Sequence, residues 1–331
     1  MVYDYDTYHG ESSAVAESCV SPNEWGEPPM TPRSRSSEST SVASPRASVL
    51  GDLAAIARDY WDYRDLLYQV TLRDIRIRYK QAVMGFGWAL LMPALVVLAG
   101  LLIKVAMATF AGRELQSSDI ASVTVKAIPW SFFVGAIGFA AGSLLANIQL
   151  VTKVYLPREV FPLAATIAQA FDTLIGAAVA AVALPFMGVP FSWTLLWVPV
   201  LAVLFFLFTT AVGLFLSCAN LFFRDVKYIV QVLLTFGIFF TPVLFEASMF
   251  GAKGSVFVML NPVSPFLEGL RLCVVEQHNL LQPLTTLGAA GQSILVWSPW
   301  YLLYALTWSI GGFLAAGLYF HRLEFVFAES I

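Results

Sequence analysis

Six long apolar runs after residue 85 limit what this chain can fold into. A helix needs about 20 apolar residues to cross a bilayer core. With 58% hydrophobic and 12% charged residues and a mean hydropathy of +0.72, the chain has too little polar surface to cover a soluble globule. The expected fold is an all-α membrane protein with six transmembrane helices, at about residues 86–110, 127–151, 161–188, 193–220, 228–245 and 300–320.

The N-terminal segment differs in composition from the rest. Residues 1–52 are rich in Ser, Pro and Glu, and such a segment buries too little apolar area to offset the entropy lost on ordering. It is predicted to be a disordered cytoplasmic tail. The first apolar run starts too late for a cleavable signal peptide, so the first span is expected to remain as an anchor.

An amphipathic segment precedes the first span, within residues 53–82. Tyr63, Leu66, Leu67 and Val70 recur at the spacing of one helix face, although Asp74 lies close to that face. This pattern predicts a helix lying in the headgroup layer, leading into a transmembrane domain over residues 83–325 and a short tail over 326–331. On a second strip lie basic residues that would face a lipid pyrophosphate or, equally, anionic lipids: Arg73, Arg76, Arg78 and Lys80.

The orientation follows from the basic residues of the loops. If both termini are cytoplasmic, the inner loops hold Arg64, the basic strip, Lys153, Arg158, Arg224, Lys227 and Arg322. The outer loops hold only Arg113, Lys126, Lys253 and Arg271. The bias favours an inner-membrane protein with both ends inside.

Residues 246–298 are moderately apolar but are repeatedly broken by Gly and Pro, so that no run reaches spanning length. Short apolar helices at membrane depth are tolerated where protein buries them. A re-entrant helical segment is expected here, with an ordinary external loop as the alternative.

The loop after the second span reads TKVYLPREVFP, residues 152–162. Pro157 and Pro162 interrupt the flanking helices, and Arg158 and Glu159 place charge between them. This pattern favours a short rigid helix that could transmit force to a soluble partner, although the segment could also be a simple turn.

Two charges fall inside the expected spans, where ionisable residues are candidates for function. Counting helical rise places Lys104 near the outer surface, where its side chain would extend toward the interface, and Asp172 near the middle of its span, facing the protein interior. The two are not expected to pair. A proton-coupling role for Asp172 is the sharper alternative. Asp172→Asn should abolish the activity of a proton-driven carrier, whereas an ATP-driven transporter should keep most of its activity.

The sequence offers little for cofactors. The three Cys and three His residues have no metal-ligand spacing, and no phosphate-binding G-x-x-x-x-G-K-[ST] loop occurs. No cofactor or metal is expected in this chain, so any ATP and Mg²⁺ would bind a separate subunit.

Three segments resemble ABC-2 type permeases that export polysaccharides such as O-antigen, capsule and teichoic acid. They are RDIRIRYKQAVMGFGWALLMP before the first span, KVYLPREVFPLA after the second, and NPVSPFLEGLR before the last. The resemblance covers residues 60–325 approximately, in the family's order and with its span count. It departs at AVMG, where relatives more often carry a Ser and a Leu, and in the long N-terminal tail.

The resemblance implies a function for each segment. The basic helix would be a gate helix that presents lipid-linked glycan, and Asn261, Pro262 and Arg271 would belong to the re-entrant pair. ATPase contacts would come from Lys153, Tyr155, Leu156, Pro157, Arg158, Glu159, Arg224 and Asp225. The working unit would be a permease homodimer with two copies of an ABC ATPase, binding no nucleic acid.

Other functions remain open from the sequence. Teichoic acid export is the closest alternative to O-antigen or capsule export. An integral membrane glycosyltransferase or acyltransferase would need clustered carboxylates, or a His with acidic neighbours, at one membrane face. The chain offers such residues only in the outer segment, as Glu246, Glu268, Glu276 and His278. A secondary transporter would depend on Asp172 alone.

Overall fold

The computed structural model describes residues 51, 58, 61–80, 85, 87–110, 112, 114–153, 156–287 and 293–330. The tail expected over residues 1–52, apart from Gly51, and the expected ATPase contact Tyr155 lie outside these residues.

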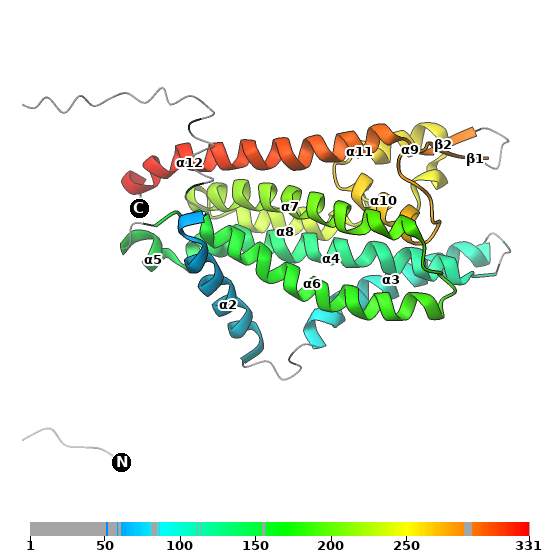
Figure 1. The fold of residues 1–331 in the computed structure, drawn as a ribbon, viewed down its shortest axis with the longest axis horizontal. Helices are drawn as coiled ribbons and strands as arrows, with labels where there is room; N and C mark the ends of the chain where they lie inside the picture. Colours follow the sequence, from blue (N-terminus) through cyan, green and yellow to red (C-terminus); the bar gives the residue numbers. More distant parts are fainter. Residues whose placement is uncertain are drawn as a thin grey trace, which may run out of the picture. The chain divides into compact units, whose positions relative to one another are not determined.

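Long apolar helices dominate the described ranges, where five are long and apolar enough to cross a membrane. This confirms an all-α membrane protein. They are α3 (Gly87–Phe110), α4 (Ser117–Ala146), α6 (Val160–Phe186), η1 with α7 (Trp193–Leu196 and Trp197–Phe222), and α11 (Pro299–Leu306) continued by a π-helical turn (Thr307–Gly311) into α12 (Gly312–Ser330) (Figure 1).

The second span starts earlier than the apolar run predicts. Helix α4 begins at Ser117 rather than at residue 127, and ends at Ala146 before the short α5 (Ile148–Lys153). The assignment of Lys126 to an outer loop was wrong, because it lies within α4 with a fully buried side chain. Its ammonium group donates a 2.6 Å hydrogen bond to the carbonyl of Phe245, which compensates its burial.

The fifth apolar run forms a shorter helix than predicted. Helix α8 (Val226–Gly237) has 12 residues, or about 18 Å at the helical rise, against a hydrocarbon core of about 30 Å. Turns follow it over residues 238–245. The fifth predicted span, and with it the count of six, therefore stays a prediction.

Two short helices fill the broken segment that follows. They are α9 (Gly251–Met259) and α10 (Ser264–Val274), and every residue of α10 is buried. Their lengths agree with the expected re-entrant pair, whose depth in a membrane stays a prediction. An antiparallel hairpin that the sequence pattern did not predict follows them: β1 (Leu284–Leu287) pairs with β2 (Ser293–Trp297), and Thr286 lies opposite Ile294.

Aromatic rings hold α10 against the long helices. The Phe205 and Phe266 ring centroids are 5.0 Å apart, and the Phe133 and Phe208 rings stack at 6.1 Å. Such pairs add to the stability gained by burying area. Helices α4, α7 and α10 therefore share one core.

Helices α3 and α4 approach closely at Gly100. A Cβ atom at this position would lie 2.5 Å from Val123 Cγ1. The contact requires a residue without a side chain at Gly100.

The amphipathic segment forms α2 (Arg64–Lys80), which packs against α6. Leu66, Leu67 and Val70 contact a buried cluster that includes Leu144 and Phe161. The apolar face expected in the headgroup layer is thus covered by protein. Tyr68 and Ile77 are the large apolar side chains that α2 leaves exposed.

Candidate functional site

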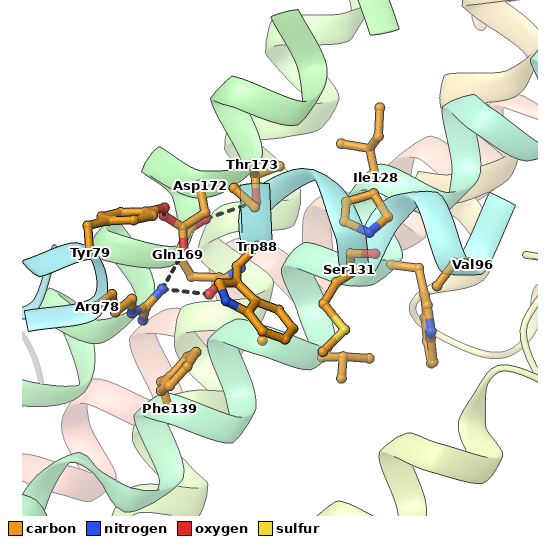
Figure 2. A pocket seen from close by; sticks show the side chains of 16 residues that line it. Arg78, Tyr79, Trp88, Val96, Ile128, Ser131, Phe139, Gln169, Asp172 and Thr173 are labelled. Atoms are coloured by element: carbon orange, nitrogen blue, oxygen red, sulfur yellow. Dashed lines mark hydrogen bonds and ion pairs between the residues drawn. The ribbon is translucent and has the colours of Figure 1, made fainter. Parts of the chain in front are cut away.

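A polar cluster joins the C-terminal end of α2 to the middle of α6. Arg78 Nη1 lies 2.5 Å from Asp172 Oδ2 and donates a 2.9 Å hydrogen bond to Gln169 Oε1. The Tyr79 hydroxyl donates to Asp172 Oδ1, and the Arg78 guanidinium lies 3.8 Å from the centre of the Phe139 ring. Figure 2 shows these side chains converging from three helices. We call Arg78, Tyr79, Gln169 and Asp172 the α2–α6 cluster.

Electrostatics fix the protonation of Tyr79. Burial raises the pKa of its hydroxyl, and the hydrogen bond to Asp172 raises this pKa further. The phenol therefore stays protonated and acts as the donor to the carboxylate.

A cavity of about 450 Å³ lies beside the α2–α6 cluster. Its walls come from α2, α3, α4 and α6, and combine the polar groups of the cluster with aromatic rings such as Trp88, Trp130 and Phe139 (Figure 2). Gly135 makes room for the Gln169 amide, because a Cβ atom there would lie 2.7 Å from Gln169 Cδ. The cavity thus has a charged side and an apolar side.

Asp172 is level with the start of the first span. Gly176, one turn further along α6, faces the Ala89 carbonyl and the Pro93 ring, each 3.9 Å from its built Cβ position. Counting helical rise from residue 161 predicts that Asp172 lies near the middle of its span. Helix α6 begins well before the point at which it meets the start of α3. Counting from residue 161 therefore places Asp172 too far along the bundle relative to α3.

The four basic residues of α2 form two groups: Arg73 and Arg78 make ion pairs, whereas Arg76 and Lys80 are exposed. In the first group, Arg73 Nη2 lies 2.9 Å from Asp74 Oδ1 and donates a 2.7 Å hydrogen bond to Asn147 Oδ1, and Arg78 forms the ion pair with Asp172 described above. Two of the four expected lipid-pyrophosphate contacts therefore also attach α2 to the helix bundle.

The charged residues expected to contact the ATPase lie mainly in two turns, before α6 and between α7 and α8. The short helix predicted near residue 157 lies upstream, as α5, while residues 156–159 form a turn before α6. A proline disfavours helical geometry in the residue before it, which explains the turn at Pro157. Arg158 is half-buried and Glu159 is 3% exposed, whereas Arg224 and Asp225 are exposed between α7 and α8.

At the opposite end of the long helices lies a second set of charges, the outer charge cluster (Lys104, Asp119, Glu246, Glu268, Arg271 and Glu276). Lys104 Nζ lies 3.2 Å from Asp119 Oδ1 and 2.6 Å from Glu246 Oε1. The expectation that Lys104 extends outward was wrong: the side chain is fully buried, because two carboxylates neutralise it. As expected, Lys104 and Asp172 do not pair.

Arg271 occupies the other half of the outer charge cluster. Its guanidinium lies 2.6 Å from Glu268 Oε1 and 2.9 Å from Glu276 Oε1. Burial alone would raise the pKa of the Glu246 carboxyl, but the positive charges of Arg271 and Lys104 outweigh burial and lower it, so Glu246 stays ionised.

Asn261 and Pro262 form the turn between α9 and α10. The side-chain Oδ1 of Asn261 accepts a 3.1 Å hydrogen bond from the backbone amide of Val263, and its side-chain Nδ2 donates to the Phe240 carbonyl at 3.2 Å. These bonds fix the start of α10, which carries Arg271.

The outer carboxylates are committed to these ion pairs, which disfavours the enzyme alternative. Among the described residues, no group of His, Cys, Asp and Glu side chains could hold a metal ion. Sequence reasoning missed the partnerships of Asp119, Glu246 and Glu268, although opposite charges flanking apolar runs were a usable signal.

Sequence comparisons identify proteins that are similar to this chain. The family model "ABC-2 type transporter" matches residues 139–274. The chain is 28% identical over 247 residues to the O-antigen export system permease protein RfbA of Myxococcus xanthus, a match that covers 73% of this chain and 93% of that protein. A protein of the same name from Klebsiella pneumoniae is 28% identical over 212 residues, covering 62% and 79% of the two chains. These matches make the chain similar to ABC-2 type transporter permeases, and its apolar helices are those of a multi-pass membrane protein.

Proposed function

We propose that this chain is the permease of an ATP-driven exporter that moves lipid-linked O-antigen across the cytoplasmic membrane. The observation that carries the proposal is the similarity to an O-antigen export permease over 93% of that protein's length. The described helices supply a membrane domain of matching type.

The proposed working unit is a homodimer of this permease with two separate ABC ATPase subunits. The chain itself has no phosphate-binding loop of the Walker type, so ATP hydrolysis needs another polypeptide. Helix α3 leaves a row of large apolar side chains exposed, namely Leu95, Leu98, Leu102 and Val105. Such a face supports contact with a second permease across a shared passage.

The ATPase would bind at the end of the helices that carries α5 and the turn between α7 and α8 (Figure 1). Both termini would lie on this cytoplasmic side. Arg158, Arg224 and Asp225 present charge there. Lys153 is the last residue of α5, and Leu156 and Pro157 lead into the turn before α6.

Reversing one charge tests this docking surface. We expect Arg158→Glu to reduce the amount of ATPase that copurifies with the permease, because a contact that attracts an opposite charge becomes repulsive. Glu159 is left unchanged, since its burial means that reversing it would disturb the fold. Lys253→Glu, on an exposed position of α9, is the matched control. Equal copurification for both variants would remove the turn from the interface.

The lipid-linked glycan would approach α2. Arg76 and Lys80 place exposed cations near the level at which α3 starts, and the Arg78 guanidinium lies in the neighbouring cavity. A pyrophosphate is a concentrated anion, and arginine matches its geometry.

Deleting the gene tests the proposed function. An exporter defect leaves lipid-linked glycan intact inside the cell and removes it from the surface, whereas loss of a glycosyltransferase or acyltransferase alters the glycan itself. Surface labelling and mass spectrometry of extracted lipid-linked glycan separate these outcomes. The structure of the accumulated glycan also separates O-antigen from capsule and teichoic acid. Normal surface glycan in the deletion strain contradicts the proposal.

A further inference from the structure

The last membrane span contains a π-helical turn at Thr307–Gly311, between α11 and α12. In the described ranges no other helix contains one. A π turn bonds each residue to the fifth along the chain instead of the fourth, so it holds one residue more than an α-helical turn. In a regular α-helix, an extra residue rotates everything after it by about 100°. The wide turn absorbs that residue, so α11 and α12 each keep the face that they bury.

Two side-chain hydroxyls bond to the backbone at this turn. The Thr307 hydroxyl donates a 2.9 Å hydrogen bond to the Leu303 carbonyl, and the Ser309 hydroxyl donates a 2.8 Å hydrogen bond to the Ala305 carbonyl. Within a membrane, Ser and Thr side chains and local π geometry give partners to backbone groups that the α-helical ladder releases. The same bonds also favour bending of the helix.

Two glycines follow at the end of the turn. A Cβ atom at Gly311 would have no neighbour within 4 Å, and at Gly312 the nearest atom, the Ala211 Cβ, would be 3.7 Å away. Packing therefore does not require glycine at either position. Glycine allows the backbone more conformations than any other residue, and kinks concentrate at glycines and π turns.

The π turn also separates two hydrophobic clusters. Ala305, on α11, is buried in the same cluster as Phe266 of α10. Ala316 and Phe320, on α12, are buried in a different cluster, which includes Val70 of α2. The first half of the span is thus attached to the re-entrant segment, and the second half is attached to the side of the bundle that carries α2.

We propose that the π turn is a hinge, at which α12 changes its angle to α11 while α11 stays attached to α10. Movement of α12 together with α2 then rearranges one end of the permease and leaves the cluster around α10 intact. The use of this hinge in transport rests on the proposed function, whereas the hinge itself does not.

Deleting one residue tests the hinge. Ile310 is half-exposed in the π turn, so its deletion should leave an α-helical turn and keep the buried faces of α11 and α12 in place. Deletion of Val203, an exposed residue of α7, is the matched control, because no wide turn there absorbs the change. We expect the protein without Ile310 to unfold near the normal temperature but to lose most of its export, and the protein without Val203 to unfold at a clearly lower temperature. Equal destabilisation by both deletions overturns the proposal, and so does normal export without Ile310.

Replacing both glycines stiffens the turn without changing the chain length. Gly311→Ala with Gly312→Ala has room for both methyl groups, and alanine favours a helix over glycine. In the purified permease, we expect the double variant to slow hydrogen–deuterium exchange over residues 303–316 and to leave exchange in α10 unchanged. Unchanged exchange over residues 303–316 contradicts the hinge. Because this measurement needs no transport, slower exchange beside normal surface glycan in the gene-deletion strain would refute the export function alone.

A reversible cross-link tests whether α12 moves against α7. The Phe215 and Tyr319 ring centroids are 5.6 Å apart, and both side chains are partly exposed. With cysteine at both positions in a Cys19→Ser background, a bifunctional methanethiosulfonate should stop export, and reduction should restore it. The control pair is Leu260→Cys with Tyr304→Cys, which joins α9 to α11 where the Tyr304 hydroxyl donates a 2.6 Å hydrogen bond to the Leu260 carbonyl. We expect this second cross-link to leave export unchanged. Continued export with α12 linked to α7 overturns the proposal, and so does loss of export with α9 linked to α11.

Discussion

Asp172→Ala is expected to detach α2 from α6 and to abolish export. The substitution leaves Arg78 without its counter-charge and removes the carboxylate that accepts the Tyr79 hydrogen bond, while Gln169 keeps its hydrogen bond from Arg78. Breaking a buried ion pair costs about 3 to 5 kcal/mol, and the lower end applies because the two side chains keep 18% and 11% exposure. Thermal unfolding of the purified permease and surface labelling of glycan measure the two effects.

Two variants show whether the ion pair itself matters. The exchange Arg78→Asp with Asp172→Arg should recover much of the stability and export, since it restores opposite charges. A proton-coupled carrier would not recover, because its carboxylate would have moved to α2. Asp74→Asn is the matched control, because its pair with Arg73 is more exposed and should cost less than about 1 kcal/mol. An Asp172→Ala protein with normal stability would show that α2 is held by its apolar face alone.

Glu268→Gln is expected to destabilise the permease by about 3 kcal/mol. The Glu268 side chain is fully buried and lies 2.6 Å from Arg271, so its neutralisation leaves a buried guanidinium with one remaining, half-exposed partner. Glu276→Gln, which removes that half-exposed partner, should cost no more than about 1 kcal/mol.

Cysteine reactivity measures this difference between the two Glu variants. Cys218 and Cys273 are free, buried thiols, and Cys273 lies on α10. In a Cys19→Ser background, heating should expose these thiols to a fluorescent maleimide at a clearly lower temperature in Glu268→Gln than in Glu276→Gln. Identical transitions would show that Glu268 does not anchor α10.

Much of the fold follows from the apolar runs, and little of the site does. Helices α3, α6 and α7 match their runs within a few residues, because the length of an apolar helix is set by the hydrocarbon it must cross. The start of α4 and the burial of Lys104 depend on partners such as Glu246, 142 residues away in sequence. Periodicity cannot report such pairs. Likewise, the basic strip of α2 was predicted, but the use of Arg78 to hold α6 was not.

The missing side chain at Gly100 has a consequence for sequence variation among relatives. The Gly100–Val123 contact lies one helical turn from the Lys104–Asp119 ion pair, on the same line of contact between α3 and α4. A larger residue at Gly100 separates the helices and lengthens that ion pair. A relative with a bulky residue at this position therefore has no use for a buried lysine one turn later, so positions 100, 104 and 119 should covary as a unit.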